Sequence, residues 1–417
     1  MTPQELPGTW NVVELAALRA PIEYSLVGGP FGSDLTTADY QDEPGVPVIR
    51  GTNLGRDTGR FVDEGFVFVS EAKAKLLERN MAFPGDIVFT QRGTLGQVAL
   101  IPAESRYPRY VVSQSQMKLT PDPTKIDRRF LFHYFRSPMA LERITARTLA
   151  TGVPHINLGI LRSFPVSYPP LTEQRRIADL LDRSESLRVQ RREALSKLDV
   201  LIRALFVDLF GEPIANPYGF PVKPLGELAA KFSDGPFGSN LKSSHYTDTG
   251  VRVVRLQNIG VGSFVDDDRA FISQGHFAEL KKHECRPGDV LVGTLGDPNL
   301  RACIQPNWLS VALNKADCVQ IRADERIANA AYICALLNQP STERMAQDLI
   351  LGQTRLRISM GRLRGLLVPV PPLELQHAFA HRIAAVERVK AVQRASLTEM
   401  DALFDSLQYR AFRGELT

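Results

Sequence analysis

The sequence predicts an α+β protein with two homologous domains, each followed by one long helix, the two helices pairing as an antiparallel coiled coil. Three observations lead to this prediction. The phrase "GGPFGSDL" at residues 28–35 returns as "DGPFGSNL" at residues 234–241. Two segments of about forty residues lack the Gly and Pro that interrupt helices. The rest consists of short β-rich runs between turn signals, without regular alternation of strands and helices.

The repeat extends well beyond the opening phrase. The run "GVPVIRGTNLG" from Gly45 is matched by "GVRVVRLQNIG" from Gly250, and "FPGDIVFTQRGTLG" from Phe83 by "RPGDVLVGTLG" from Arg286. Further on, "HINLGILRSFPVSYPPL" is matched by "LRISMGRLRGLLVPVPPL". The order of the matches is preserved, and their spacing drifts only as insertions in surface loops would cause. The chain therefore contains two homologous halves.

Each half ends in a segment that reads as a long amphipathic helix, starting after the proline pairs at 169–170 and 371–372. At 1.5 Å per residue, about forty residues make a rod of roughly 60 Å, far longer than a globular helix needs. A spacer is the use that this length suggests. Apolar side chains recur three and four residues apart along each segment. They are Ile177, Leu180, Leu187, Ala194, Leu198, Leu201 and Leu205 in the first, and Phe379, Ile383, Val386, Leu397, Met400, Phe404 and Leu407 in the second.

The two helices are expected to pair with each other. Both predicted seams carry a polar residue near the middle, Arg191 in the first and Gln393 in the second. A polar position in such a seam costs stability but fixes register and partner. An antiparallel pair would place the two domains at opposite ends, related by a pseudo-twofold axis. The alternative is that each helix packs only on its own domain.

The remaining residues predict mixed domains around a curved or barrel-like sheet. Short β-rich runs such as "VPVIRGTN", "DIVFTQ" and "VRVVRLQN" precede helical stretches such as "RRFLFHYFRSPMALERITART". We therefore expect domains at residues 1–168 and 215–370, with the long helices at 169–214 and 371–417.

The composition excludes several classes of protein. Of the 417 residues, 44% are hydrophobic and 23% charged, as in soluble globular proteins, and no apolar run approaches the length of a membrane span. The N-terminus lacks the regions of a signal peptide, which favours a cytoplasmic protein. A net charge of +4 permits a nucleic-acid partner without requiring one. The four cysteines are spaced too widely for zinc or redox motifs and are expected to be buried free thiols: Cys285, Cys303, Cys318 and Cys334.

No known catalytic, cofactor or phosphate-binding motif is present. His377 and His381 have metal-ligand spacing on the second long helix, but no third ligand accompanies them, so we expect solvated histidines and no metal. One cluster resembles a nuclease site, with carboxylates and a lysine around the run "FVFVSEAK": Asp57, Asp63, Glu71 and Lys73.

The internal repeat argues against this nuclease interpretation. The second copy places Gln274 and His276 where the first has Glu71 and Lys73, whereas it keeps a serine, Ser70 in the first copy and Ser273 in the second. A helix N-cap explains a retained serine better than catalysis does.

Binding is the remaining interpretation, because both halves deliver polar side chains at matching places. Arginine and the amides of Asn and Gln are the side chains that contact guanine and adenine edges with two hydrogen bonds. The candidates in the first half are Ser33, Arg50, Asn53, Gln91, Arg92, Thr94, His155 and Asn157. Those in the second half are Ser239, Arg255, Gln257, Asn258, Thr294, Arg355 and Arg357. Matching positions with different identities are what two modules reading two sequences would have.

These features together resemble a known family. The doubled "GPFGSxL", the "PPLTEQRRIADLLDRSE" that opens the first helix and the terminal "LFDSLQYRAFRGEL" are similar to those of the specificity subunit of Type I restriction-modification enzymes. The resemblance implies two target-recognition domains that bind the two halves of a split double-stranded DNA site. It also implies that the helices dock methylation subunits, and that methylation and ATP-driven cleavage belong to other subunits.

Two further expectations follow from the resemblance. The Gly-Pro-Phe-Gly turn would be a rigid loop that brings backbone amides or Ser33 and Ser239 to the DNA, although a purely structural turn remains open. The second helix opens with "PPLELQHAFAHRI", without the Glu-Gln-Arg-Arg of the first, so contact with the second methylation subunit is expected to be asymmetric. A nuclease, or a DNA- or protein-binding scaffold of another phage-defence system, stays as an alternative.

Overall fold

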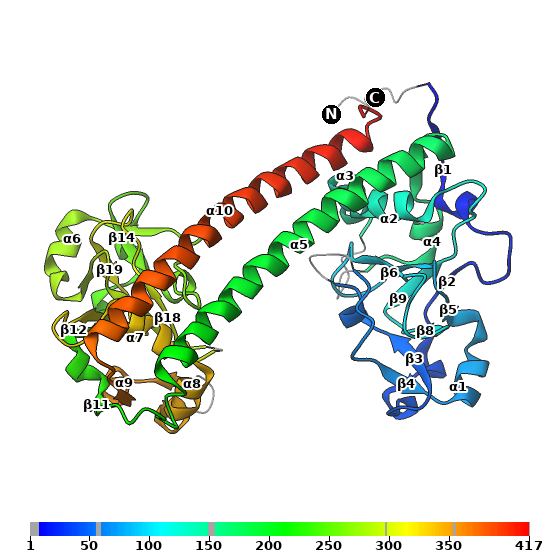
Figure 1. The fold of residues 1–417 in the computed structure, drawn as a ribbon. Helices are drawn as coiled ribbons and strands as arrows, with labels where there is room; N and C mark the ends of the chain where they lie inside the picture. Colours follow the sequence, from blue (N-terminus) through cyan, green and yellow to red (C-terminus); the bar gives the residue numbers. More distant parts are fainter. Residues whose placement is uncertain (1–7, 56–59, 149–154, 297, 353–355, 417) are drawn as a thin grey trace. The chain divides into compact units, whose positions relative to one another are not determined.

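The computed structural model describes residues 8–55, 60–148, 155–296, 298–352 and 356–416, and it divides into two compact units. The first unit contains Met1–Arg191 and Ser396–Thr417, and the second contains Arg192–Ala395. Figure 1 shows their elements. Among the described residues, no helix is long and apolar enough to cross a membrane.

The first unit is built on two four-stranded sheets and a short pair of strands. One sheet is antiparallel, with the order β2 (Leu26–Gly28), β9 (Gln116–Leu119), β6 (Ile87–Thr90) and β7 (Val98–Leu100). The other has the order β4 (Val67–Val69), β3 (Val46–Ile49), β8 (Tyr110–Val112) and β5 (Met81–Ala82), with β3 parallel to β8. β1 (Asn11–Glu14) pairs with β10 (Pro165–Tyr168).

Four short α-helices lie among the described residues of the first unit. They are α1 (Glu71–Leu76), α2 (Arg128–Arg136), α3 (Pro138–Ala146) and α4 (Leu158–Arg162). Each begins at a polar residue whose side chain accepts hydrogen bonds from the first turn: Ser70, Asp127, Ser137 and Asn157. The aromatic side chains of α2 fill the main core of the unit, against the sheet that contains β6.

The second unit repeats this arrangement, with one additional edge strand in its mixed sheet and one additional pair of strands. Its antiparallel sheet has the order β12 (Ala229–Asp234), β20 (Cys318–Ala323), β17 (Val290–Gly293) and β18 (Arg301–Ile304). Its mixed sheet has the order β13 (Tyr246–Thr247), β15 (Ala270–Ile272), β14 (Val251–Val254), β19 (Ala312–Asn314) and β16 (Glu284–Cys285), with β14 parallel to β19. β11 (Val222–Pro224) pairs with β23 (Leu367–Pro369), and β21 (Ile350–Leu351) with β22 (Arg357–Ile358).

The helices of the second unit match those of the first in order. They are α6 (Gln274–Glu279), α7 (Ala330–Leu337), α8 (Pro340–Ala346) and α9 (Met360–Arg364). Even single bonds recur: the hydroxyl of Tyr134 donates to the carbonyl of Pro165, and that of Tyr332 to the carbonyl of Pro369. The α+β fold with two homologous halves is therefore confirmed.

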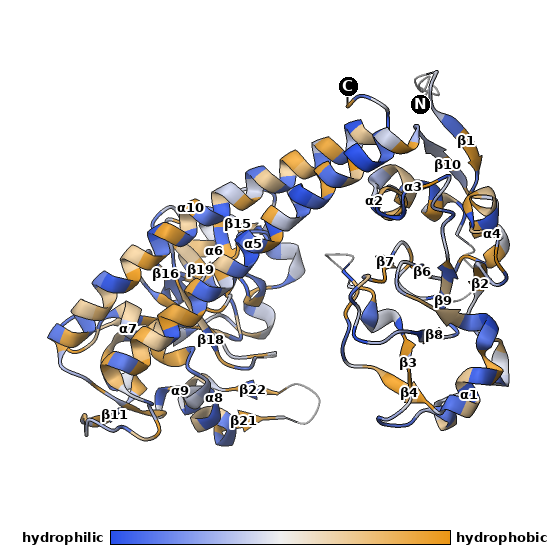
Figure 2. Cartoon of the chain, turned by 45° about the vertical axis from the view of Figure 1, so that its right-hand side comes forward, coloured by the Kyte–Doolittle hydropathy of each residue, from blue (hydrophilic) through white to orange (hydrophobic). Residues whose placement is uncertain are grey.

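The two long helices run from Leu171 to Phe210 (α5) and from Leu373 to Ala411 (α10), with hydrophilic and hydrophobic residues along both (Figure 2). One buried glutamine near the start of each fixes it to its own domain. Gln174 bonds the backbone of Asp127 and Pro169, and Gln376 bonds that of Asn329 and Pro371 in the same way.

Contacts inside each unit establish that the helices pair antiparallel. In the first unit, Arg188 of α5 forms an ion pair of 2.6 Å with Asp401, near the end of α10. In the second unit, Lys390 of α10 forms an ion pair of 2.7 Å with Asp199, in the later part of α5. The separation between Arg188 and Lys390 along the chain equals that between Asp199 and Asp401, so the two ion pairs are equivalent in the repeat.

The predicted seam of the first helix is wrong at two positions, because Leu187 and Leu201 are exposed. The buried stripe at its start instead follows every fourth residue: Ile177, Leu181, Glu185 and Val189. The physical reason is that α5 also packs on α2, where Arg136 pairs with Glu185 at 2.7 Å. Packing on its own domain and pairing with the other helix therefore coexist.

Candidate DNA interface

Three loops of the first unit carry the candidate side chains. The first loop, residues 50–54, follows β3; the second, residues 91–97, follows β6; and the third, residues 155–157, precedes α4. A hollow of about 600 Å³ lies between the first two and is lined by Arg50, Arg92 and Thr94 among others. The structure thus brings these three predicted residues together.

The second and third loops of the first unit are joined by backbone hydrogen bonds. Arg92 and His155 form an isolated antiparallel bridge, and the amide of Ile156 donates to the carbonyl of Gln91 at 3.0 Å. Arg92 and Thr94 are exposed, whereas Gln91 and His155 are half-buried. This joining aligns two loops that are distant in the sequence.

Asn157 is exposed, and its side-chain oxygen accepts a hydrogen bond of 2.8 Å from the amide of Ile160, which caps α4. Its counterpart Ser359 caps α9 in the same way, by accepting from Arg362. Asn157 therefore has a structural role that the sequence prediction did not include.

The matching loops of the second unit are residues 255–259 after β14, residues 294–300 after β17 and residues 357–359 before α9. The asparagine of the first loop is an interior residue in both units. The oxygen of Asn53 accepts from the amide of Arg50 at 2.9 Å, and its NH2 group donates to two carbonyls at 3.0 Å. Asn258 does the same for Arg255 and two carbonyls of its own unit. Both side chains are buried, so we drop Asn53 and Asn258 from the candidate DNA contacts. An amide three residues after the arginine, beside a turn, was the signal for this capping role.

The two arginines of the first loop are anchored differently. Arg50 is half-buried and donates to the carbonyl of Gly65 at 3.2 Å. Arg255 forms an ion pair with Asp268, and its guanidinium lies 6.0 Å from the centre of the Tyr246 ring. Arg255 would therefore have to break its ion pair with Asp268 before its guanidinium could bind a phosphate or a base.

The second unit joins its own second and third loops by the same device. Leu295 and Arg357 form the isolated bridge, and the amide of Ile358 donates to the carbonyl of Thr294 at 2.9 Å. Thr294 is buried and its hydroxyl donates to the carbonyl of Asp317, so we drop it too. Arg357 is exposed and lines a hollow of about 190 Å³ with Phe237.

The remaining candidates of both units are placed as follows. Gln257 is exposed on the first loop. Arg355 lies outside the described residues. Ser33 and Ser239 are exposed at the two Gly-Pro-Phe-Gly turns.

Arg301 is a residue that the sequence analysis missed. Its guanidinium donates to the carbonyls of Leu256 and Ile259 in the first loop and to those of Leu295 and Pro298 beyond it, at 2.7–3.2 Å. In the first unit, the corresponding loops are linked by a longer bond, 3.4 Å from Gln97 to the carbonyl of Leu54. In the strand register Gln97 stands at the place of Arg301, because Val98 pairs with Phe89 as Ala302 pairs with Val292. Gln97 follows Gly96 directly, whereas residues 297–300 separate Arg301 from Gly296, so the sequence repeat gave no signal.

The described members of the nuclease cluster each have other partners. Lys73 pairs with Asp39 at 2.8 Å, and Glu71 pairs with Arg109. Asp63 accepts hydrogen bonds from the hydroxyl of Tyr110 and the amide of Arg106. Asp57 lies outside the described residues, and no group of metal-ligating side chains occurs among the described ones.

The retained serines are N-caps, as predicted. The hydroxyl oxygen of Ser70 accepts from the amide of Lys73 at 3.1 Å, and that of Ser273 accepts from His276 at 3.2 Å. His377 and His381 are exposed on α10.

All four cysteines are buried and free, as predicted. Burial raises the pKa of Cys318 and of Cys334 to about 12, and that of Cys285 and Cys303 also rises.

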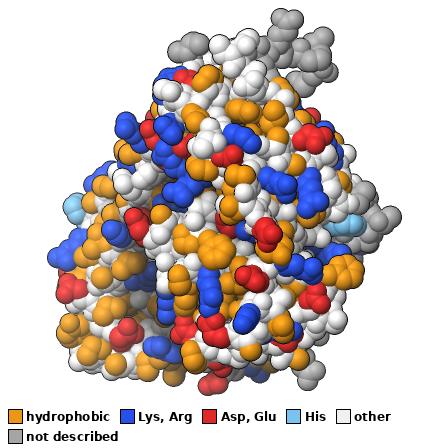
Figure 3. Space-filling model, turned by 90° about the vertical axis from the view of Figure 1, so that its right-hand side faces the viewer, with side chains coloured by type: hydrophobic (Ala, Val, Ile, Leu, Met, Phe, Trp, Pro, Cys, Tyr) orange, Lys and Arg blue, Asp and Glu red, His pale blue; other side chains and the backbone are white. Residues whose placement is uncertain are grey.

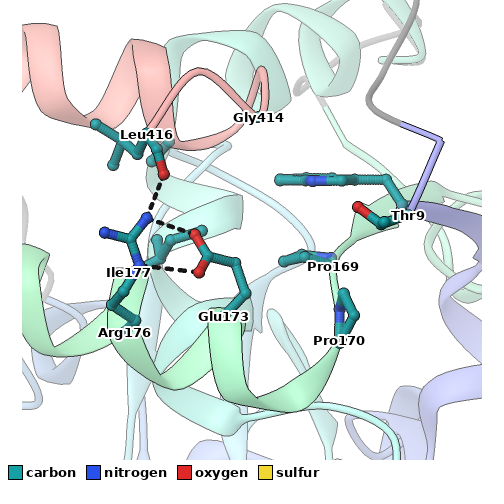
Figure 4. A pocket seen from close by; sticks show the side chains of 10 residues that line it. Thr9, Pro169, Pro170, Glu173, Arg176, Ile177, Gly414 and Leu416 are labelled. Carbon is teal, nitrogen blue, oxygen red and sulfur yellow. Dashed lines mark hydrogen bonds and ion pairs between the residues drawn. The ribbon is translucent and has the colours of Figure 1, made fainter.

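A second hollow, about 460 Å³, lies where α5 begins and is lined by residues of the first unit (Figure 4). Arg176 binds the carboxylate of Glu173 at 2.6 and 2.9 Å and donates to the carbonyl of Leu416. The second helix has Leu375 and Ala378 at the corresponding places, so this clamp belongs to the first helix alone. The loss of Glu-Gln-Arg-Arg in the second copy thus has a structural consequence.

Basic side chains do not form one continuous patch on the visible face of the molecule. In Figure 3, Lys and Arg are interspersed with acidic and hydrophobic residues. This distribution agrees with the small net charge of +4.

Comparison with known proteins finds similarity to type I specificity subunits. Residues 32–196 match the model of the Type I restriction modification DNA specificity domain. The specificity subunit of the type I restriction enzyme EcoKI from Escherichia coli strain K12 is 20% identical over 440 residues, covering 100% of this chain and 91% of the relative. The MjaVIII specificity subunit from Methanocaldococcus jannaschii is 21% identical over 304 residues, 70% of this chain and 71% of the relative.

Solved structures share the fold. The S subunit of a Type I restriction-modification system from M. genitalium matches with a TM-score of 0.54 at 17% identity, over 99% of both chains. A chain from a structure of a type I restriction-modification system, solved to study its assembly and conformational transition, matches with a TM-score of 0.55 at 21% identity. It covers 99% of this chain and 100% of that one. These matches support the resemblance drawn from the sequence: the chain is similar to type I specificity subunits along its length and shares their fold.

Proposed function

We propose that this type I specificity subunit binds a bipartite double-stranded DNA site and directs methylation and restriction subunits to it, without catalysing a reaction itself. Residues 1–168 would read one half of the site and residues 215–370 the other. The long helices at 169–214 and 371–417 would separate the two domains. DNA inside the cell is the substrate, so the proposal includes action in the cytoplasm.

One observation carries the proposal: the two units share a scaffold but differ in the side chains that the joined loops present. The bridge between the second and third loops contains Arg92 and His155 in the first unit, but Leu295 and Arg357 in the second. The arginine therefore lies in the second loop of the first unit, as Arg92, but in the third loop of the second unit, as Arg357. The backbone pairing between the two loops is the same in both units. Two modules with one scaffold and different donors suit two different half-sites.

The remaining candidates supply the rest of the proposed contact. In the first unit they are Ser33, Arg50, Gln91, Thr94 and Asn157, and in the second Ser239, Arg255, Gln257 and Arg355. Arginine at a loop edge suits guanine or phosphate, and exposed amides suit adenine or phosphate.

Exposed apolar side chains on the long helices support the docking of methylation subunits. Leu187 of α5 and its repeat counterpart Val389 of α10 are both exposed, as are Leu201 and Leu403. Two equivalent sets of apolar side chains suit two copies of one partner. The clamp of Arg176 and Glu173 lies near only one of the two helix starts and supports asymmetric docking.

The proposal is tested by mapping methylated sites in cells that carry this chain with its methylation subunits. Replacing residues 1–168 by the same domain of a related chain should change one half-site and leave the other unchanged. Arg92→Ala should weaken the base preference at one position of the first half-site. Arg357→Ala should do the same at one position of the second. Each should cost about 1 to 3 kcal/mol of binding if the arginine contacts a base with two hydrogen bonds.

Two exposed arginines away from the loops serve as controls. Arg109 pairs with Glu71 in the first unit, and Arg326 pairs with Asp324 in the second. Arg109→Ala and Arg326→Ala should leave both half-sites unchanged. Simultaneous change of both half-sites on swapping one domain would overturn the two-module proposal.

A further inference from the structure

The two Gly-Pro-Phe-Gly turns present an exposed phenylalanine in both units. Phe31 is 85% exposed and Phe237 is 50% exposed, whereas the prolines before them, Pro30 and Pro236, are buried. Folding gains little from a ring that stays in water, since the favourable free energy comes from apolar area removed from it. Packing inside the unit therefore does not explain why these two positions carry a ring with so much exposed surface.

Glycine is required at two positions of each turn, the first because the backbone packs closely on a neighbouring loop and the second because its φ is positive. A Cβ at Gly29 would lie 2.0 Å from the carbonyl oxygen of Ser113, and one at Gly235 would lie 2.0 Å from the carbonyl carbon of Lys315. The turns therefore pack directly on the loops that follow β8 and β19. Just after each phenylalanine, Gly32 and Gly238 have φ of 51° and 59°, in the left-handed region that favours glycine.

Each turn is also anchored by a hydrogen bond to the residue before its first glycine. The side-chain NH2 of Asn80 donates to the carbonyl of Gly28 at 2.7 Å. At the matching place, His283 donates from Nδ1 to the carbonyl of Asp234 at 2.6 Å. Different side chains thus perform the same anchoring, so the position of the turn is common to both units.

The turns lie beside the candidate DNA-binding loops. In the first unit, the amide of Gly29 donates to the carbonyl of Gln116, which lines the same hollow as Arg92. In the second unit, Phe237 itself lines the hollow that contains Arg357. The Phe237 ring therefore faces whatever Arg357 binds, and Phe31 stands at the matching place in the repeat of the first unit.

The phenylalanine is identical in both units, while the neighbouring loop residues differ. Gln91 corresponds to Thr294, and His155 to Arg357. A side chain that reads a base must differ between two different half-sites. An identical side chain is suited to a feature that both half-sites share, which is the stacked duplex itself.

We propose that Phe31 and Phe237 are wedges that insert against the base stack of the two half-sites, independently of sequence. The inference rests on the proposed function. Apolar wedges between base steps partly unstack them and kink the duplex. An anchored ring needs little further ordering to do so, because its backbone is already fixed. Arginines at the rim of the same hollows would hold the flanking phosphates.

The test uses the complete complex of this chain with its methylation subunits and a duplex carrying 2-aminopurine, whose fluorescence rises when it is unstacked. One duplex series carries the probe in the first half-site and another in the second. Binding of the unchanged complex should raise the fluorescence in both. Phe31→Ala should abolish the rise in the first half-site only, and Phe237→Ala in the second only.

Affinity provides a second measurement. Each alanine variant should bind DNA about tenfold more weakly, on the order expected for removing one contact between an aromatic ring and a base. The recognised sequence should stay the same. Phe31→Trp should restore both affinity and fluorescence, because a flat ring is retained. Leu76→Ala is the matched control, since Leu76 is 80% exposed on α1 of the same unit and should change neither.

Three outcomes would overturn the wedge. The first is unchanged fluorescence and affinity in folded Phe31→Ala and Phe237→Ala. The second is loss of methylation subunits from the purified complex with unchanged DNA contact, which would assign the rings to a protein partner. The third is a change in the recognised bases. Failure of the unchanged complex to bind any duplex would instead refute the proposed function.

Discussion

The first unit keeps its two candidate loops apart around an open hollow, whereas the second ties the corresponding loops together with one arginine. In the first, Gln97 donates to the carbonyl of Leu54 at 3.4 Å. In the second, Arg301 holds four carbonyls of both loops. The antiparallel sheet has the same strand order in both units, and the mixed sheet of the second has one additional edge strand. The scaffold fixes where the loops start, and the side chains between them fix how rigid they are.

This difference has a functional consequence within the proposed role. Loops held by a single long hydrogen bond can adjust to the DNA, while loops held by a guanidinium are organised before binding. We therefore expect the second half-site to be read with less adjustment of the protein than the first.

Arg301→Leu should have the largest effect on stability. It leaves four carbonyl groups without their donor, and the second unit should lose on the order of 2 to 4 kcal/mol. All four cysteines lie in the second half, so the rate of thiol labelling in mild urea reports the opening of that unit alone. Labelling should be faster in Arg301→Leu than in the unchanged chain.

Gln97→Leu is the matched change in the first unit. It removes one weak hydrogen bond and should cost less than about 1 kcal/mol, measured by urea unfolding. An equal loss of unfolding free energy in the two variants would show that the loops of both units are equally constrained, which would contradict the proposed difference between them.

The two ion pairs across the helices offer a second contrast. The side chain of Lys390 is 2% exposed and contacts Asp199 at 2.7 Å and Glu387 at 2.6 Å. Neutralising both acceptors with Asp199→Asn and Glu387→Gln leaves a buried ammonium without a counter-charge. We expect a cost of about 2 kcal/mol in urea unfolding, since the partner carboxylates are themselves partly exposed.

The equivalent change in the first unit should be milder. Arg188 lies 4.2 Å above the centre of the Phe404 ring, and this contact survives in Asp401→Asn. The expected cost is below about 1 kcal/mol. Lys390→Met should also cost little, because it removes the buried charge itself. A larger loss in Lys390→Met than in the acceptor variant would contradict this account.

Much of the fold was predictable because it is repeated. The recurrence of "GPFGS", the proline pairs and the retained Ser70 and Ser273 predicted two homologous domains, two long helices and two N-caps, all of which the structure contains. Helix length follows from the absence of Gly and Pro over a long window, which is a local property.

The errors occurred where the outcome depends on neighbours that are distant in the sequence. Leu187 fits a seam by spacing, but the helix packs on two partners and the buried stripe turns toward α2. Asn53 has the chemistry of a base contact, but the chain bends back and its amide satisfies three backbone groups. Arg301 matches Gln97 only in the strand register, because residues 297–300 separate it from Gly296 whereas Gln97 follows Gly96 directly, so the sequence repeat did not indicate it.

The smallest effect concerns the thiols, which only the second unit contains. Burial raises the pKa of Cys318 and Cys334 to about 12, whereas a thiol in an unfolded chain has a pKa of about 8.5. At pH 8 the folded thiols are therefore almost wholly protonated, and Ellman's reagent should label none of them at the rate of free cysteine. In denaturant all four should react at once.

The sign of the pH effect follows from the same pKa shift. A group whose pKa is raised in the folded state contributes stability that is intact below the unfolded pKa and is lost as the pH rises through the folded one. Between about pH 8.5 and 12, the unfolded thiols ionise while the folded ones stay neutral. The second unit should thus lose stability in urea over this range, and a Cys318→Ala, Cys334→Ala variant should lose less with the same rise in pH. If the native protein reacts fully with Ellman's reagent at pH 8, the thiols are open to solvent and this contrast between the units does not hold.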